Sequence, residues 1–149
     1  MSQSRINITN KRASYDYHLI NTYDAGMVLT GTEIKSIRAG NANLTDAFCF
    51  LKDDELFLRG MHIGTWKQGS YYNHEPLRVR KLLLKKSELR KIRSKALEKG
   101  FTVIPVKVFL SETGYAKVQI AIAQGKKSFD KRDDLKKKDA ERALKSTDY

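Results

Sequence analysis

The chain has 149 residues, of which 29 are lysine or arginine and 17 are aspartate or glutamate, so its formal net charge is +12. This length suits one domain with a single core, and a hydrophobic content of 40% excludes a wholly disordered chain. The sequence has neither a run of about eighteen apolar residues nor an apolar N-terminal signal, which predicts a cytoplasmic protein without a membrane partner.

The first predicted element is a β-hairpin. Asp16–Thr22 and Met27–Thr30 favour strands, and the aspartate and glycine of Tyr23–Gly26 favour a turn between them. A short helix is expected over Thr32–Arg38, because Ile34 falls three residues before Ile37.

A second hairpin is predicted from two aromatic-rich runs, Phe48–Lys52 and Glu55–Ile63, which Asp53 and Asp54 separate. The following stretch, from Gly64 to Arg80, has no regular hydrophobic period and contains Trp66, Tyr71 and Tyr72. We expect a long loop there, whose aromatic side chains either stack on bases or pack within the loop.

The clearest helix signal lies between Ser87, a candidate N-cap, and Gly100, a candidate stop, with Leu89, Ile92 and Ala96 at helical spacing. A third hairpin is expected from Phe101–Leu110 and Tyr115–Ala123. Pro105 cannot donate a hydrogen bond to a neighbouring strand, so its strand should lie at an edge or carry a bulge. These six strands, with one helix before the last pair, predict a mainly β fold over residues 1–124, a small closed β-barrel.

The last segment, residues 125–149, is predicted to be a basic tail. It contains nine basic and six acidic residues, with three acid-before-base pairs at helical i, i+4 spacing, but few apolar side chains. We expect it to be disordered alone and helical on a partner.

Charge is concentrated in particular segments of the sequence. Between Arg78 and Lys99 there are ten basic residues against two acidic ones. Such a field attracts polyanions, so RNA, DNA or an anionic membrane surface is favoured over a small-molecule substrate, and of these we expect RNA.

Motifs for catalysis or cofactor binding are weak. The segment Gly31–Ser36 lacks the glycine that a phosphate-binding P-loop needs before its lysine, and Gly125–Ser128 fails in a similar way. The three histidines are scattered, which does not favour a metal site, and Cys49 between two phenylalanines is expected in the core. We therefore predict a binding protein without a cofactor, not an enzyme.

Several ordered motifs give the chain a resemblance to the SsrA-binding protein (small protein B) family. They are Asn10-Lys-Arg-Ala13, Thr22-Tyr-Asp-Ala-Gly26, Gly31-Thr-Glu-Ile-Lys-Ser-Ile-Arg-Ala-Gly40, Arg80-Lys-Leu-Leu-Leu84, and Gly125-Lys-Lys127 followed by Asp130-Lys-Arg132. The resemblance implies a small closed antiparallel barrel of the oligonucleotide-binding (OB) type with accessory helices. It also implies that this barrel binds the tRNA-like domain of transfer-messenger RNA (tmRNA), around its D-loop and elbow. It further implies delivery of tmRNA to the A site of stalled ribosomes in trans-translation, where the tail enters the empty mRNA channel and becomes helical. We expect a monomer.

The resemblance also implies roles for individual residues. Asn10, Asp24 and Leu83 fall where the family contacts RNA, and we add the neighbouring cations of the same motifs. The full RNA-binding set is Asn10, Lys11, Arg12, Asp24, Lys35, Arg38, Arg80, Lys81 and Leu83. The ribosome-binding tail set is Gly125, Lys126, Lys127, Asp130, Lys131, Arg132, Lys136, Lys137 and Lys138. Asp24 stands where many members have glutamate, and Thr32 replaces a common tryptophan.

Two alternatives remain open at this point. One is a general single-stranded RNA binder on the same fold, which would need only the barrel face. The other is an assembly protein that docks on ribosomal proteins, whose affinity would depend less steeply on salt than that of an RNA binder.

Overall fold

A computed structural model describes residues 6–67 and 73–125 of the chain. The strands are β1 (Asn7–Thr9), β2 (Tyr17–Met27), β3 (Ala42–Asn43), β4 (Phe48–Lys52), β5 (Glu55–Arg59), β6 (His62–Ile63), β7 (Arg80–Leu83), β8 (Phe101–Leu110) and β9 (Ala116–Gly125). The helices are α1 (Ala13–Asp16), α2 (Gly31–Arg38) and α3 (Lys86–Ala96).

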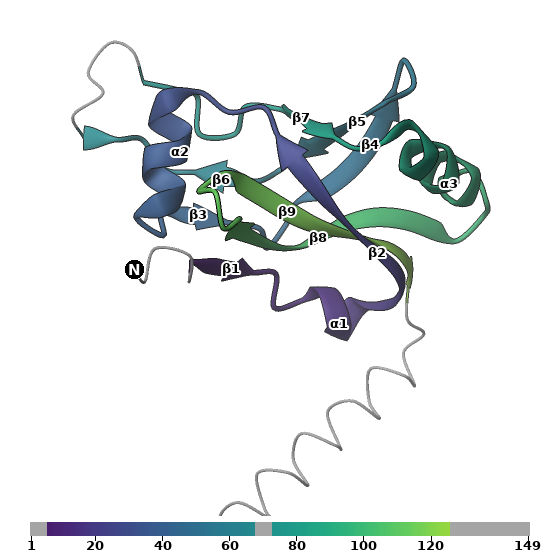
Figure 1. The fold of residues 1–149 in the computed structure, drawn as a ribbon. Coiled ribbons are helices and arrows are strands. Elements are labelled where there is room, and N and C mark those ends of the chain that lie inside the picture. Colours follow the sequence, from purple (N-terminus) through teal and green to yellow (C-terminus); the bar gives the residue numbers. More distant parts are fainter. Residues whose placement is uncertain (1–5, 68–72, 126–149) are drawn as a thin grey trace, which may run out of the picture.

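Six strands close into a ring. The sheet order is β8-β4-β5-β7-β2-β9, and antiparallel pairing between β8 and β9 joins its two ends, while β1 pairs with the other edge of β8. β3 and β6 form a separate two-stranded sheet beside α2 (Figure 1). The predicted mainly β fold, a small closed antiparallel sheet with accessory helices, is confirmed.

The core fills the inside of the ring. Strand residues alternate, so that Leu56 and Leu58 of β5 and Val118 and Ile120 of β9 point inward and are fully buried. Ile92 on α3 is equally buried and belongs to the same cluster, so this helix closes one end of the ring.

The predicted first hairpin is wrong. Residues 17–27 form one continuous strand, β2, which pairs with β9 along almost its whole length, from Tyr17 opposite Gly125 to Gly26 opposite Lys117. A bulge lies between Leu19 and Asn21. Nine residue pairs with β9 outweigh the local turn tendency of aspartate and glycine. The strand count of six still holds for the ring, because β7, which the sequence did not predict, replaces Met27–Thr30.

The other two hairpins are confirmed, but the predicted strand Glu55–Ile63 is too long. It ends at Arg59, because Gly60 with φ of 84° turns the chain, and His62–Ile63 form β6 in the separate sheet. Asp53 and Asp54 have φ of 53° and 61°, the left-handed conformation that both central residues of a type I′ turn need. Pro105 lies at a register shift between β8 and β9, as its missing N–H predicts.

α2 agrees with the predicted helix, whereas both ends of α3 differ from the prediction. α2 covers the predicted segment and begins with a capping box, in which Thr30 N–H donates to the Glu33 carboxylate over 2.9 Å. The N-cap of α3 is Lys85, not Ser87, because the Glu88 carboxylate accepts from the Lys85 N–H. The same helix ends at Ala96, and Gly100 lies beyond it with φ of 87°.

Gly60 lies at a turn where the backbone leaves no room for a side chain. Its φ is 84°, and a Cβ at this position would lie 2.7 Å from the carbonyl oxygen of Asp46. We expect Gly60→Ala to lower the free energy of unfolding in urea by about 2 kcal/mol or more. Gly31→Ala is the matched control, since a Cβ there meets nothing within 4 Å, and it should cause no loss.

Candidate nucleic-acid interface

The nine predicted RNA-binding residues do not lie on one continuous surface. Asn10, Lys11 and Arg12 precede α1 at one end of β2, whereas Asp24 lies near its other end. Lys81 and Leu83 lie on the adjacent strand β7, and Lys35 and Arg38 on α2. Since a strand rises about 3.3 Å per residue, the two ends of β2 are roughly 30 Å apart.

The N-terminal group lies beside a groove of about 340 Å³ between α1 and strands β4 and β8. Asn10 is buried, and its side-chain amide donates to the Pro105 carbonyl over 3.0 Å, at the bulge of β8. Its Oδ1 accepts from the Arg12 N–H over 3.3 Å. Arg12 and Lys11 are exposed. Asn10 therefore holds this segment against β8, and the two cations beside it face solvent.

The second group lies on the outer face of β7, β2 and β9. Gly26 pairs with Leu83 on one side and with Lys117 on the other, and Asp24 pairs with Gln119. Leu83 is 52% exposed, and a Cβ on Gly26 would lie only 3.4 Å from the Leu83 Cβ. Glycine at this position thus leaves room for Leu83 to lie over β2, with Asp24 on the same outer face.

A groove of about 720 Å³ continues this face toward α2 and the turn between β8 and β9. Leu83, Arg38, Lys117 and Tyr115 are among its lining residues, and Tyr115 is 72% exposed. The Arg38 guanidinium donates to the Gly114 carbonyl over 3.3 Å, which ties α2 to that turn. A leucine, an aromatic ring and two cations in one groove can bind a base and its phosphates together.

Lys35 is exposed on α2 but does not line this groove. Tyr115, Lys117 and Gln119 were not predicted as site residues. Their signal was present in the sequence, because they alternate with the inward-facing Ala116 and Val118 of the same strand.

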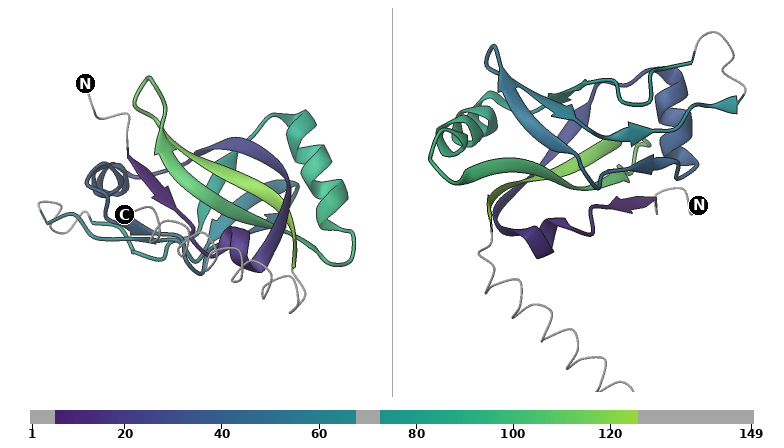
Figure 2. Two further views of the ribbon diagram at one scale, coloured as in Figure 1. Left: turned by 90° about the horizontal axis from the view of Figure 1, so that it is seen from below. Right: turned by 180° about the vertical axis from the view of Figure 1, so that it is seen from behind.

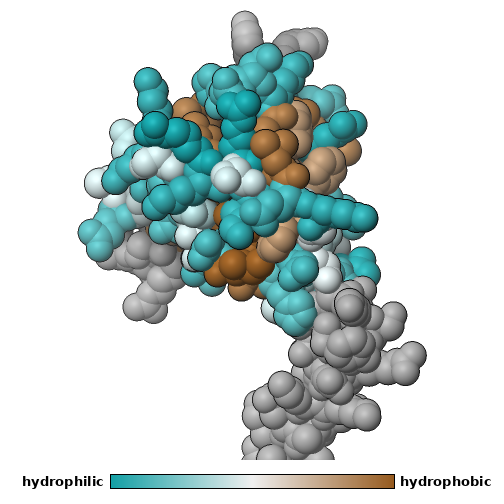
Figure 3. Space-filling model, turned by 90° about the vertical axis from the view of Figure 1, so that its right-hand side faces the viewer, coloured by the Kyte–Doolittle hydropathy of each residue, from teal (hydrophilic) through white to brown (hydrophobic). Residues whose placement is uncertain are grey.

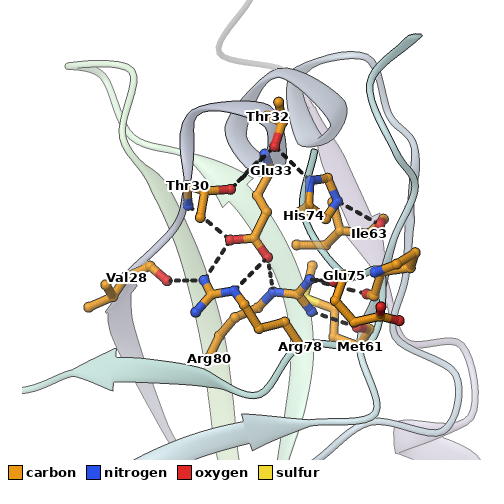
Figure 4. A network of polar contacts seen from close by, with 11 residues as sticks. Val28, Thr30, Thr32, Glu33, Met61, Ile63, His74, Glu75, Arg78 and Arg80 are labelled. Carbon is orange, nitrogen blue, oxygen red and sulfur yellow. Dashed lines mark hydrogen bonds and ion pairs between the residues drawn. The ribbon is translucent and has the colours of Figure 1, made fainter. Parts of the chain in front are cut away.

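A buried network of polar contacts holds α2 against β7 (Figure 4). The Glu33 carboxylate accepts from Arg80 over 2.5 Å and from Arg78 over 2.6 Å, and its side chain is completely buried. Arg80 also donates to the Met61 carbonyl over 2.7 Å. Beside it, His74 is hydrogen-bonded to the Thr32 hydroxyl over 2.8 Å, and its other ring nitrogen donates to the Ile63 carbonyl.

The environment of Glu33 sets its ionisation. Burial alone would raise its pKa, but hydrogen bonds from Arg78, from the Thr30 N–H and from Arg80, together with the Arg80 charge, lower the pKa to about 2. The carboxylate is therefore ionised in the folded protein at neutral pH, and its single charge is shared by two guanidinium groups, of which Arg78 is partly exposed to solvent.

Arg80 is a correction to the predicted RNA-binding set. It is 0% exposed, and among the described residues its guanidinium donates only to Glu33 and to backbone carbonyls, so it is a structural residue in the core. Burial lowers the pKa of Arg80, while Glu33 raises it. The neighbouring Lys81 is partly exposed and forms an ion pair with Glu55 over 2.9 Å.

The basic segment around α3 is largely at the surface, and Figure 3 shows that face as mainly hydrophilic. Arg93 is paired with Asp54, and Lys95 lies 3.5 Å from Glu98 and 5.4 Å from the Phe101 ring centre. Lys86 and Arg90 have no ion-pair partner among the described residues.

Other candidate residues are placed as follows. Cys49 is buried in the core as predicted, and burial raises the pKa of its thiol. The backbone of Trp66 exchanges two hydrogen bonds with the Asn73 side chain. Tyr71 and Tyr72 and the tail residues from Lys126 onward lie outside the described residues, while Gly125 is the last residue of β9.

The described residues contain neither a metal site nor a membrane-spanning helix. No group of three or more His, Cys, Asp or Glu side chains in residues 6–67 and 73–125 could hold a metal ion. The helices of that same part are all too short or too polar to cross a lipid bilayer.

Comparison with known proteins gives consistent results. The family model described as "SmpB protein" matches residues 7–147. An "SsrA-binding protein" of Phocaeicola vulgatus is 53% identical over 144 residues, covering 97% of this chain and 96% of the relative. Proteins of the same description from Salinispora tropica and Bacillus pumilus are 52% and 51% identical, each covering 91% of this chain and 85% and 86% of the relative.

A solved structure is similar as well. It is described as "tmRNA-SmpB: a journey to the center of the bacterial ribosome", and it aligns with a TM-score of 0.70 at 46% sequence identity. The alignment covers 83% of this chain and 86% of that chain.

Proposed function

The chain belongs to the SmpB protein family, and on that premise we propose that it binds the tRNA-like domain of tmRNA and delivers it to stalled ribosomes in trans-translation. The observation that carries the proposal is the match to SsrA-binding proteins at about half identity over nearly the full chain. The role is one of binding, with no catalytic step and no cofactor. It places the protein in the cytoplasm, on the ribosome.

The outer face of β7, β2 and β9 is the proposed contact with tmRNA. Asp24 and Leu83 are close together on this face. Leu83 on β7 pairs with Gly26 on β2, and Asp24 lies two residues before Gly26 on the same side of that strand. The Asp24 carboxylate can accept hydrogen bonds from amino or 2′-hydroxyl groups, while Leu83 packs on a base or a sugar. Arg38 and Lys117 in the adjoining groove supply charge to nearby phosphates.

Residues 126–149 are the proposed ribosome-binding segment. Gly125, the last residue before this segment, pairs with Tyr17, which follows α1 directly, so β9 ends beside α1. Its nine basic residues suit an rRNA channel.

A competition titration tests the proposed function. Labelled tRNA-like domain of tmRNA is bound to the protein at physiological salt and challenged with excess elongator tRNA or poly(U). We expect tmRNA to be retained. Equal competition by every RNA would instead support a general single-stranded RNA binder, and an affinity that is insensitive to salt would support docking on ribosomal proteins.

Variants of the outer face test the proposed site. Asp24→Ala and Leu83→Ala should each weaken binding of the tRNA-like domain about tenfold, with unchanged thermal unfolding, because both side chains are exposed. Leu97→Ala is the matched control, since Leu97 is also an exposed leucine but lies at the end of α3. Wild-type affinity of both site variants would remove this face from the tmRNA contact.

A further inference from the structure

Three phenylalanines line the outer face of the hairpin formed by β4 and β5. Cys49, Leu56 and Leu58 alternate with them and point into the core. Phe48 is 42% exposed, and Phe50 and Phe57 are partly exposed. The core cluster includes the inward residues of both strands but none of the three phenylalanines. We call this row the phenylalanine face.

The rings of the phenylalanine face are close enough to act together. Phe50 and Phe57 are directly opposite in the strand pairing, with ring centres 5.6 Å apart and planes inclined by 23°. The Phe48 ring centre lies 6.4 Å from that of Phe50, at an inclination of 49°. Successive bases in a single strand can stack on such neighbouring rings.

Cations alternate with the rings. Arg59 pairs with Phe48 in the strand register, and Lys81 of β7 pairs with Phe57. Arg59 is exposed and has no ion-pair partner among the described residues, whereas Lys81 is held by Glu55. A protein partner with an apolar surface would gain little from these charges. The phosphates of an RNA strand whose bases stack on the rings would pair with them.

The phenylalanine face also connects the two separate groups of predicted RNA-binding residues. Phe48 lines the same groove as Asn10 and Arg12. At the other edge, Lys81 on β7 is two residues before Leu83 on the same outer side. Seen from behind, the hairpin lies in front, with α3 at one side and α2 at the other (Figure 2, right). A path of rings and cations therefore crosses β4, β5 and β7 from one group to the other.

We propose that the phenylalanine face is a stacking platform for unpaired bases of RNA. The proposal rests on the RNA-binding function above and extends it to a second kind of contact. The outer face of β7, β2 and β9 would bind folded RNA, and the platform would bind a single-stranded stretch, whose phosphates contact Arg59 and Lys81. The three adjacent rings lie outside the core cluster and are all at least partly exposed, which leaves their outer side open to a ligand.

The test uses the full-length protein with a short oligouridine that carries 2-aminopurine, whose fluorescence is quenched when it stacks. The variants are Phe48→Leu and Phe57→Leu, alone and together, because leucine keeps an apolar side chain on the strand and removes the aromatic ring. Phe109→Leu is the matched control, since Phe109 is partly exposed on β8 with Lys107 above its ring.

We expect each single variant to weaken oligouridine binding about fivefold or more and to reduce quenching, with a larger loss in the double variant. The Phe109→Leu control should bind like the wild type. Wild-type affinity and quenching in the double variant would overturn the platform. Normal oligouridine binding combined with reduced binding to ribosomal proteins would also overturn it, in favour of a protein-docking face. If the wild type binds neither oligouridine nor tmRNA, the proposed function itself fails.

Discussion

Replacing Glu33 with glutamine is expected to lower the free energy of unfolding by about 3 to 5 kcal/mol, the range for breaking a buried ion pair from one side. Glu33 and Arg80 are both completely buried, so the variant leaves a guanidinium in the core without its counter-charge. One of the two oxygens that accept from Arg78 and Arg80 also becomes an NH₂ group, which cannot accept a hydrogen bond from either guanidinium. Chemical denaturation of both proteins measures the difference.

Glu55→Gln is the matched control for this experiment. Glu55 is also paired with a cation on β7, Lys81, but both side chains are roughly two-fifths exposed, at 45% and 39%. Solvent screens such a pair, and its loss should cost less than about 1 kcal/mol. Equal losses in the two variants would mean that the buried network contributes nothing beyond a surface pair.

The same carboxylate predicts how stability depends on pH. Its pKa is lowered in the folded state to about 2 from an ordinary 4.5. The unfolded chain therefore takes up a proton first as the pH falls, and the stabilisation from Glu33 is complete above about pH 4.5 and lost toward pH 2. The difference in unfolding free energy between wild type and Glu33→Gln should shrink by about 3 kcal/mol across that interval.

Removal of residues 126–149 is expected to abolish tagging of nascent chains on an mRNA without a stop codon, while binding of the tRNA-like domain falls only modestly. The truncation ends after Gly125 because that residue pairs with Tyr17 and belongs to β9. In vitro translation measures tagging, and a gel-shift titration measures RNA affinity.

Charge variants within the full chain serve as controls for the truncation. Changing Lys136, Lys137 and Lys138 to arginine keeps the charge and should preserve tagging, whereas changing them to glutamate should abolish it. If the truncated protein lost most of its affinity for the tRNA-like domain, the segment would belong to the tmRNA contact, and the proposed division between the two parts would be wrong.

Local signals predicted the parts of the fold that depend on neighbours in sequence. The hairpin at Asp53 and Asp54 and the capped helix α2 need only adjacent residues, and both are confirmed. The continuous strand β2 was missed because its pairing partner, β9, lies about a hundred residues further along the chain. No local pattern contains that contact.

The residues of the candidate site were predicted only in part, because the site also depends on contacts between residues that are distant in sequence. Leu83 and Arg38 lie in one groove, although they are far apart in sequence. Arg80 was misplaced because a cation in a basic motif suggests a surface residue. Its alternation with Leu82, which also points inward, was the only sequence signal for burial, and its partner Glu33 is 47 residues away.

The pairing of β2 with β9 has a consequence for how the protein folds. The ring cannot close until β9 is available, because Tyr17 pairs with Gly125 and no other strand of residues 6–67 and 73–125 covers that edge of β2. Contacts this distant in sequence slow folding, since the loop between them must be closed before they stabilise anything. During synthesis the edge of β2 therefore stays unpaired until β9 has emerged, and an unpaired strand edge is a site where wrong pairing can begin.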